Sequence, residues 1–291
     1  MGWILATLIA AVAQTGRNAA QTQLTRQIGT MGATAVRFLF GLPFALFFLG
    51  AVALFEEIPL PGAATLGWTA LGAVAQIGAT AFMLQAMNLR GFGVVTALTK
   101  TEPVTLALMG ALIFHEYLGP MRLAAIVIAT LGVVMMSGAT QWRGNWWPMF
   151  LGVLSGALFG LSSIGFRGGI LNLPSGDFLV RATTTLALNL TMQTVLVLLW
   201  LGLANRAALR GMAQHWKNSL GAGFLGAFAS QFWFIGFALA PAANVRTLAL
   251  IEVPMAQLVS GRVFKQKTSP RQLIGMALIV LGVGLLIAVS V

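Results

Sequence analysis

The sequence contains no cysteine, which excludes disulfide frameworks, thiolate metal sites and cysteine nucleophiles. Charged residues are scarce at 8%, and only six of them are Asp or Glu. The two histidines fall in connecting segments, and neither an HExxH pattern nor a nucleophile and base arrangement is present. These absences argue against an enzyme, so we expect no catalytic residues, no cofactor and no metal.

Apolar residues dominate instead. Hydrophobic residues make up 58% of the chain and the mean hydropathy is +0.89, which is too apolar for a water-soluble domain. The apolar runs are close to the length of about 20 residues that a helix needs to cross the bilayer. We therefore predict an all-α polytopic membrane protein with ten transmembrane helices. Their expected ranges are 3–24, 31–54, 65–88, 93–114, 120–139, 146–167, 178–202, 219–240, 243–264 and 271–290.

An internal repeat sets the expected architecture. Glu102 corresponds to Glu252 at a spacing of 150 residues, and Arg37 corresponds to Arg181 at a spacing of 144. Residues 1–139 and 140–291 would each contain five helices. Because five is odd, the second half enters the membrane in the opposite orientation, as in the inverted repeats of many secondary transporters. The two halves are expected to form one transport unit.

Basic residues are scattered singly between the apolar segments, although the net charge is +11. This pattern does not suit nucleic acid, and it fits the loops of a protein in a lipid bilayer. The odd-numbered loops hold most of the positive charges, namely Arg26, Arg90, Arg143, Arg206, Arg210, Lys217, Lys265, Lys267 and Arg271. By the positive-inside rule, we expect these loops to be cytoplasmic.

Six charged residues fall inside the predicted helices, where a charge costs about 2.5 to 3.5 kcal/mol on insertion scales. Each needs a partner, a water-filled cavity or a function. Snorkelling to the membrane surface is an equal alternative for the two that lie near predicted helix starts, Arg37 and Arg246. The six residues are Arg17, Arg37, Lys100, Glu102, Arg246 and Glu252.

Both glutamates of the repeat lie beside prolines. A proline inside a helix frees the carbonyl four residues earlier and weakens the helix at that point. We therefore predict paired gates or hinges at equivalent depths in the two halves. The alternative is a simple kink in each helix, with the glutamate bonded to a neighbouring helix. The candidate gate and hinge residues are Lys100, Glu102, Pro103, Arg246, Glu252 and Pro254.

The first predicted helix carries a polar face. Gln14, Arg17, Asn18 and Gln21 follow i, i+3, i+4, i+7 spacing and so share one side of the helix. This face requires water, a ligand or another polar helix. Ser162 is the candidate that faces it from the second half, although a serine hydroxyl can also bond its own backbone without any function.

Three more residues complete the predicted cavity. Gln231 and Trp233 lie in the middle of the eighth predicted helix, and Gln85 lies at the matching place in the third. A tryptophan beside a glutamine at this depth suits a flat, partly apolar substrate. Contact with lipid or with the protein core is the commoner role of such aromatic residues and stays open.

These features together resemble the EamA-type transporters of the drug/metabolite transporter superfamily, which have ten helices in two repeats. Residues 91–136 carry most of the resemblance, with His115-Glu116 in place of the usual Gly-Glu, and Arg37 resembles the arginine that commonly opens helix 2. The second half departs further at Lys265-Gln266. In overall likeness the chain is most similar to bacterial aromatic amino acid exporters. The resemblance implies that the first to fourth and sixth to ninth helices line a central cavity, with the fifth and tenth outside it.

The sequence therefore predicts a carrier in the bacterial inner membrane that exports amino acids, aromatic or otherwise apolar, or similar small metabolites by alternating access. An exporter of multiple drugs or cationic compounds with the same fold is the alternative, and an intramembrane enzyme is a remote one. We expect the partners to be a small-molecule substrate and the lipid bilayer, with no nucleic acid. A monomer is expected, and a dimer stays open.

Overall fold

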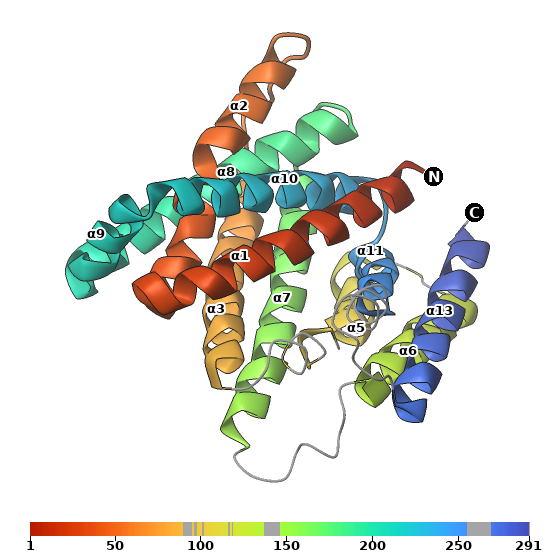
Figure 1. Cartoon of the computed structure of the whole chain (residues 1–291). Helices are drawn as coiled ribbons and strands as arrows, with labels where there is room; N and C mark the ends of the chain where they lie inside the picture. Colours follow the sequence, from red (N-terminus) through yellow and green to blue (C-terminus); the bar gives the residue numbers. More distant parts are fainter. Residues whose placement is uncertain are drawn as a thin grey trace.

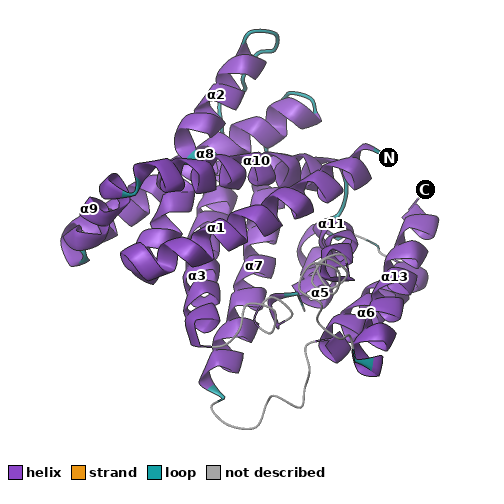
Figure 2. Cartoon of the chain, viewed as in Figure 1, coloured by secondary structure: helices purple, strands orange, loops and turns teal. Residues whose placement is uncertain are grey.

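The computed structural model describes residues 1–89, 95, 98–100, 102–115, 117, 119–136, 146–254 and 269–290. These residues form helices and loops without any strand (Figure 2). Seven of the described helical spans are long and apolar enough to cross a membrane, so the chain is an all-α polytopic membrane protein. The helices are α1 (Gly2–Leu39), α2 (Leu42–Ala53), α3 (Ala63–Leu89), α5 (Glu102–Phe114), α6 (Gly119–Met136), α7 (Trp147–Leu171), α8 (Phe178–Ala204), α9 (Arg206–Gln214), α10 (Trp216–Leu239), α11 (Ala242–Leu248), the 3-10 helix η2 (Ala249–Ile251) and α13 (Pro270–Ser290).

Seven spans rather than ten are counted for a structural reason. α1 consists of two helices joined across the kink at Gly29, and one apolar span, Ala20–Ala53, runs across this kink into α2, so the first two predicted helices are not counted separately. α5 and α11 have 13 and 7 residues and are too short to be counted. The predicted boundary between residues 139 and 140 lies outside the described residues, as do Arg90, Arg143, Lys265 and Lys267. The ten-helix count thus stays a prediction that this architecture is consistent with.

The loop predicted between residues 24 and 31 is replaced by a sharp kink at Gly29, where two helical parts of α1 meet. Gly29 has φ 73°, a left-handed conformation that glycine adopts without a steric penalty. The buried side chain of Gln21 donates a hydrogen bond from Nε2 to the carbonyl of Ala33, 2.9 Å away on the other side of the bend. Gln21 thus holds the two parts of α1 together at the kink.

The short helix α9 was not predicted, since residues 206–214 were expected to lie in a loop. Asn205 begins the helix by accepting a hydrogen bond from the Ala208 backbone N–H at 3.1 Å. Ala208 and Met212, spaced i and i+4, are buried. One contact joins α9 to the kink of α1, because a Cβ atom on Gly211 would lie 2.9 Å from the side chain of Ile28. The connection between α8 and α10 therefore packs against the bend of α1.

Three helix pairs make the most extensive contacts in the molecule: α1 with α10, α3 with α7, and α6 with α13. In each pair, one helix precedes residue 139 and the other follows residue 140. α1 and α7 are the first helices of the two predicted halves, and α3 and α10 are the third, so the first helix of each half packs on the third helix of the other. This exchange is what a two-fold relation between the halves requires. α6 and α13 lie side by side at one edge of the bundle (Figure 1).

Small residues allow the paired helices to approach closely. A Cβ atom on Gly165 of α7 would lie only 2.6 Å from the backbone nitrogen of Gly72 on α3. A Cβ atom on Gly132 of α6 would similarly lie 2.6 Å from the carbonyl oxygen of Gly275 on α13. At both points the backbones of the two helices are in direct contact.

Candidate functional site: a charged cluster inside the helix bundle

The two repeated Glu and Pro segments lie where helices are interrupted. α5 begins at Glu102, so Pro103 occupies the first turn, where its missing N–H removes no helical hydrogen bond. Leu98 and Thr99 are helical and Lys100 lies in a turn, so the helix predicted over 93–114 is interrupted just before Pro103. In the second segment, α11 ends at Leu248 and continues as the 3-10 helix η2, and α-helical geometry resumes for 252–254, which includes Pro254. The interruption includes Leu250, whose carbonyl was predicted to be freed.

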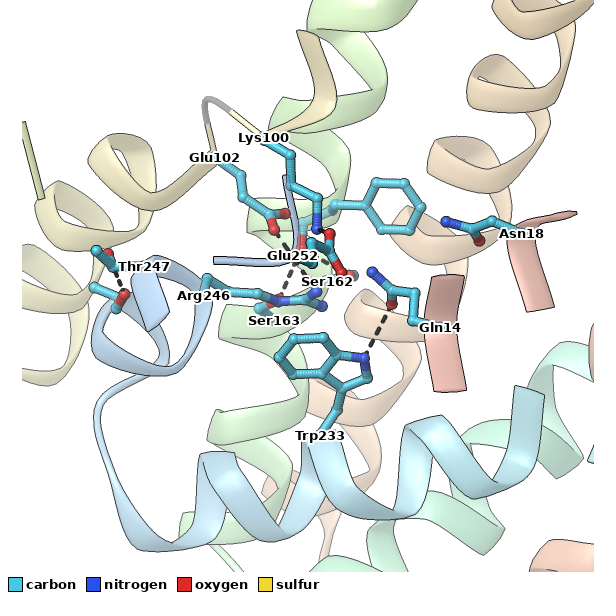
Figure 3. A network of polar contacts seen from close by, with 12 residues as sticks. Gln14, Asn18, Lys100, Glu102, Ser162, Ser163, Trp233, Arg246, Thr247 and Glu252 are labelled. Atoms are coloured by element: carbon cyan, nitrogen blue, oxygen red, sulfur yellow. Dashed lines mark hydrogen bonds and ion pairs between the residues drawn. The ribbon is translucent and has the colours of Figure 1, made fainter. Parts of the chain in front are cut away.

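Two ion pairs connect these interrupted segments. Lys100 Nζ pairs with Glu252 Oε1, and Arg246 Nη1 lies 3.6 Å from Glu102 Oε1. The exposed fractions of the four side chains range from 4% to 12%, so water screens these pairs weakly. Figure 3 shows the four side chains converging between α5 and the segment that follows α11. Each pair joins a residue of 1–139 to a residue of 140–291. The first part supplies the cation of one pair, Lys100, and the anion of the other pair, Glu102.

Arg246 is the most connected residue of this cluster. Besides Glu102, its Nε donates to Ser163 Oγ at 3.2 Å. Its guanidinium carbon lies 4.2 Å from the centroid of the Trp233 ring, which is within the range of a cation–π interaction (Figure 3). Trp233 Nε1 in turn donates to Gln14 Oε1 at 3.0 Å. A continuous set of contacts thus runs from α5 through α11 and α10 to α1.

Two further arginines are buried beside this set without a carboxylate partner among the described residues. Arg17 is 1% exposed; its Nε and Nη2 donate to Asn18 Oδ1 at 3.2 and 2.7 Å, and its Nη1 has no hydrogen-bond partner. Arg37 is 3% exposed; its Nη1 donates to Thr80 Oγ1 at 3.1 Å, and its Nε has no partner. Snorkelling of Arg37 or of Arg246, which is 4% exposed, is therefore ruled out.

A small cavity lies at the centre of these residues. Its volume is about 20 Å³, roughly the space that one water molecule needs. This conformation is therefore closed around the site, and an amino acid would enter only after the helices move apart. The residues that line the cavity are Gln14, Arg17, Asn18, Met83, Thr99, Lys100, Glu102, Phe159 and Arg246.

Five predicted cavity residues do not line this cavity, and one of them is Trp233, which contacts Arg246 and Gln14. Gln21 is at the kink of α1, and Gln231 donates from Nε2 to Thr183 Oγ1 at 2.8 Å. The hydroxyl of Ser162 donates to the Phe159 carbonyl at 2.8 Å, which is the backbone bond that was the alternative for this residue. Gln85 is exposed, because α3 directs Met83 rather than Gln85 to the interior.

Sequence reasoning missed several polar contacts of the bundle. Ser163, and not its neighbour Ser162, accepts the hydrogen bond from Arg246. Gln193 on α8 donates from Nε2 to Gln76 Oε1 on α3 at 2.9 Å, and both side chains are buried. Each of these glutamines is an isolated amide in an apolar segment. Because polar side chains inside a membrane find partners on neighbouring helices, two isolated glutamines could have predicted a contact between α3 and α8.

This arrangement suits binding rather than covalent chemistry. It presents guanidinium, ammonium, amide and carboxylate groups around a closed cavity, with an indole and a phenyl ring beside them. In the described part of the chain, no group of three or more His, Cys, Asp or Glu residues could hold a metal ion. The cluster can recognise a small polar molecule through charge and hydrogen bonds, and it can link substrate binding to the ion pairs that connect the two segments.

Comparison with known proteins finds a family match for the first part of the chain. Residues 1–138 match the EamA-like transporter family. The chain therefore carries an EamA-like transporter domain, and the expected resemblance is confirmed for this part. A solved structure titled "Crystal structure of protein" is similar with a TM-score of 0.68 over 98% of this chain and 96% of that chain. At 17% identity this likeness shows the fold alone. No curated protein matches the sequence.

Residues 1–138 are thus similar to a family of transporters, and the apolar helices fit a multi-pass membrane protein. The matched part contains Gln14, Arg17, Asn18, Lys100 and Glu102, which are five of the cavity residues. Met83 and Thr99 also lie in the matched part, whereas Phe159 of α7 and Arg246 of α11 lie beyond it. The site therefore contains residues from both halves of the chain.

Proposed function

We propose that the EamA-like domain and the second half of the chain form one secondary carrier, which exports small organic metabolites from bacteria by alternating access. Residues 1–139 and 140–291 would be the two inverted five-helix units that move against each other. Aromatic and other apolar amino acids are the first compounds to test. The observation that carries the proposal is the exchanged pair of ion pairs, Lys100 with Glu252 and Arg246 with Glu102, at two interrupted helices.

The two ion pairs can couple substrate binding to the movement of the two units against each other. If the two units separate on one side of the membrane, Lys100 and Glu252 lose each other, and so do Arg246 and Glu102. Each separation leaves buried charges uncompensated, which costs about 3 to 5 kcal/mol for a broken buried pair. A substrate with its own charged groups can replace these partners and thereby lower the cost of moving. Transport then requires the substrate.

Charge on the loops supports the proposed orientation in the inner membrane. Arg206 and Arg210 lie on α9, which packs against the kink of α1 close to Arg26. Lys217 follows at the start of α10. These basic residues of two odd-numbered loops therefore lie at the same end of the bundle, as the positive-inside rule requires for a cytoplasmic face. We propose that the carrier acts as a monomer.

Counterflow in proteoliposomes tests the proposal. Vesicles containing the purified chain are loaded with unlabelled compound, and uptake of the labelled compound is followed for a panel of apolar amino acids and aromatic carboxylates, with and without a pH gradient. We expect exchange of at least one class, and a strong loss of flux for Glu102→Ala and Gln14→Ala at normal expression.

The matched control is Arg122→Gln on α6, because Arg122 is partly exposed, does not line the cavity and donates a 3.4 Å hydrogen bond from Nη2 to the Val289 carbonyl. We expect this variant to retain its flux. Unchanged flux in both cavity variants would remove those residues from the mechanism. If no compound of the panel were exchanged, the proposed carrier activity would fail.

A further inference from the structure

The buried cluster contains more positive than negative side chains. Arg17, Arg37, Lys100 and Arg246 are all buried, and the carboxylates beside them are Glu102 and Glu252. Lys100 and Arg246 use both carboxylates. Guanidinium groups stay protonated in proteins. Two positive charges, on Arg17 and Arg37, are thus left without a carboxylate among the residues that the structure describes.

Arg17 is placed to use its charge inside the cavity. Asn18 Oδ1 accepts hydrogen bonds from Nε and Nη2, which fixes the orientation of the guanidinium. Nη1 is buried in the cavity wall and has no hydrogen-bond partner among the described residues. Arg37 lies close behind it. A Cβ atom on Gly226 of α10 would be 3.5 Å from Arg17 Cδ and 3.3 Å from Arg37 Cγ, so the two side chains lie against the same point of one helix.

The groups that contact the two arginines directly are neutral, although Lys100, Glu102 and Arg246 line the same cavity as Arg17. Arg17 has the amide of Asn18; Arg37 has the hydroxyl of Thr80 and the ring of Phe38, whose centroid lies 5.4 Å from its guanidinium carbon. Neutral acceptors and an aromatic ring offset only part of the cost of burying a charge. A cationic ligand would add repulsion, whereas an anionic ligand would supply the missing charge.

Arg17 and Arg37, which carry the excess positive charge, both lie in the first half of the internal repeat. At the spacing of 144 residues, Leu161 corresponds to Arg17 and Arg181 corresponds to Arg37. Arg181 is partly exposed and donates from Nε to the Gly176 carbonyl at 2.9 Å, away from the cavity. The second half therefore has no equivalent pair of buried arginines. One anion site is expected rather than two.

We infer that the substrate of this site is a small organic anion, whose carboxylate or phosphate group binds Arg17 Nη1 with Arg37 behind it. Met83 and Phe159 in the cavity wall face its apolar part. Among the compounds proposed above, anions are then preferred over zwitterionic amino acids, and cationic compounds are rejected. This inference rests on the proposed carrier function, since it names the substrate class of the same site.

A series of ligands with one benzyl group and different charges tests the inference. Binding to the purified full-length chain in nanodiscs is measured by calorimetry for benzylsuccinate, benzyl phosphate, N-acetylphenylalanine, phenylalanine and phenylalaninamide. We expect the anions to bind at least about tenfold more tightly than phenylalanine, in line with a charge-assisted hydrogen bond, and the cationic amide not to bind. The two doubly charged compounds separate phosphate from carboxylate recognition.

Variants connect the preference to Arg17. Arg17→Gln should remove the preference for anions, Arg17→Lys should keep it in weaker form because the charge remains, and Arg181→Gln should bind like the wild type. Phenylalanine or its amide binding as tightly as the anions, or no anion binding at all, would overturn the inference. If neutral compounds are exchanged in proteoliposomes while anions are refused, the carrier function stands and only the inference fails.

Discussion

The ion pair between Lys100 and Glu252 yields a quantitative prediction through a double-mutant cycle. Glu252→Gln leaves a buried ammonium, Lys100→Met leaves a buried carboxylate, and the double variant leaves neither. Breaking a buried pair by removing one partner costs about 3 to 5 kcal/mol, whereas neutral replacement of both partners costs little. At about 2 °C per kcal/mol for a chain of this size, each single variant should unfold about 6 to 10 °C lower than the wild type.

The two single variants should differ in a defined order. Glu252→Gln removes a carboxylate from a cluster that already holds more cations than anions, and it leaves Lys100 within coulombic range of Arg246 and Arg17 as well as of Glu102. In contrast, Lys100→Met removes one of the cations in excess. We therefore expect Glu252→Gln to be the more damaging single change.

Thermal unfolding of the detergent-purified chain, followed by fluorescence size-exclusion chromatography, measures these shifts. The double variant should recover most of the stability, which corresponds to a coupling energy of about 3 kcal/mol. Arg122→Gln, at a partly exposed residue outside the cluster, serves as the control and should change the midpoint by about 1 °C or less. If the losses of the two single variants simply added in the double variant, Lys100 and Glu252 would not be partners and the exchanged pairing would be refuted.

Three further substitutions probe helix packing, the kink and the aromatic contact. Gly165→Ala places a Cβ atom against the backbone of α3, so we expect a loss of about 1 to 3 kcal/mol in thermal unfolding; Gly67→Ala, with no atom within 4 Å, should lose nothing. Gln21→Leu removes the hydrogen bond across the bend and should cost about 1 to 3 kcal/mol by the same measurement, whereas unchanged stability would contradict its role there. Trp233→Phe keeps a ring near Arg246 but removes the N–H group that bonds Gln14, so it should cost about 0.5 to 1.5 kcal/mol, and Trp233→Leu should cost more.

The sequence predicted which charges lie in the bundle but not how they pair. Lys100, Glu102, Arg246 and Glu252 were each expected to need a partner, a cavity or a function, because isolated charges are costly inside a bilayer. The structure brings all four into one cluster. Their exchange of partners depends on where α5 lies relative to the segment after α11, which is set by tertiary packing and leaves no trace in the spacing of the residues.

Individual faces of the helices were harder to predict. In a membrane helix both the lipid-facing and the core-facing sides are apolar, so periodicity says little about which side points inward. This is why Gln85 was assigned to the cavity although it is exposed, while Gln76, two and a half turns earlier, is buried against Gln193. Gln14, Arg17 and Asn18 of the predicted polar face line the cavity, whereas Gln21 of the same face bonds across the kink of α1.

The pairing of helices across the two halves also bears on how the chain is made. During synthesis α1 enters the membrane long before its main partner α10 exists; Gln14 and Trp233, which join them, are 219 residues apart. Until then Arg17 and Arg37 have no packed surroundings, and the exposed glycines of α3 have no α7 to contact. Contacts so distant in sequence form late and slowly. During synthesis, the first half is therefore the part of the chain whose unpaired polar and glycine-rich helix faces most depend on shielding by the insertion machinery.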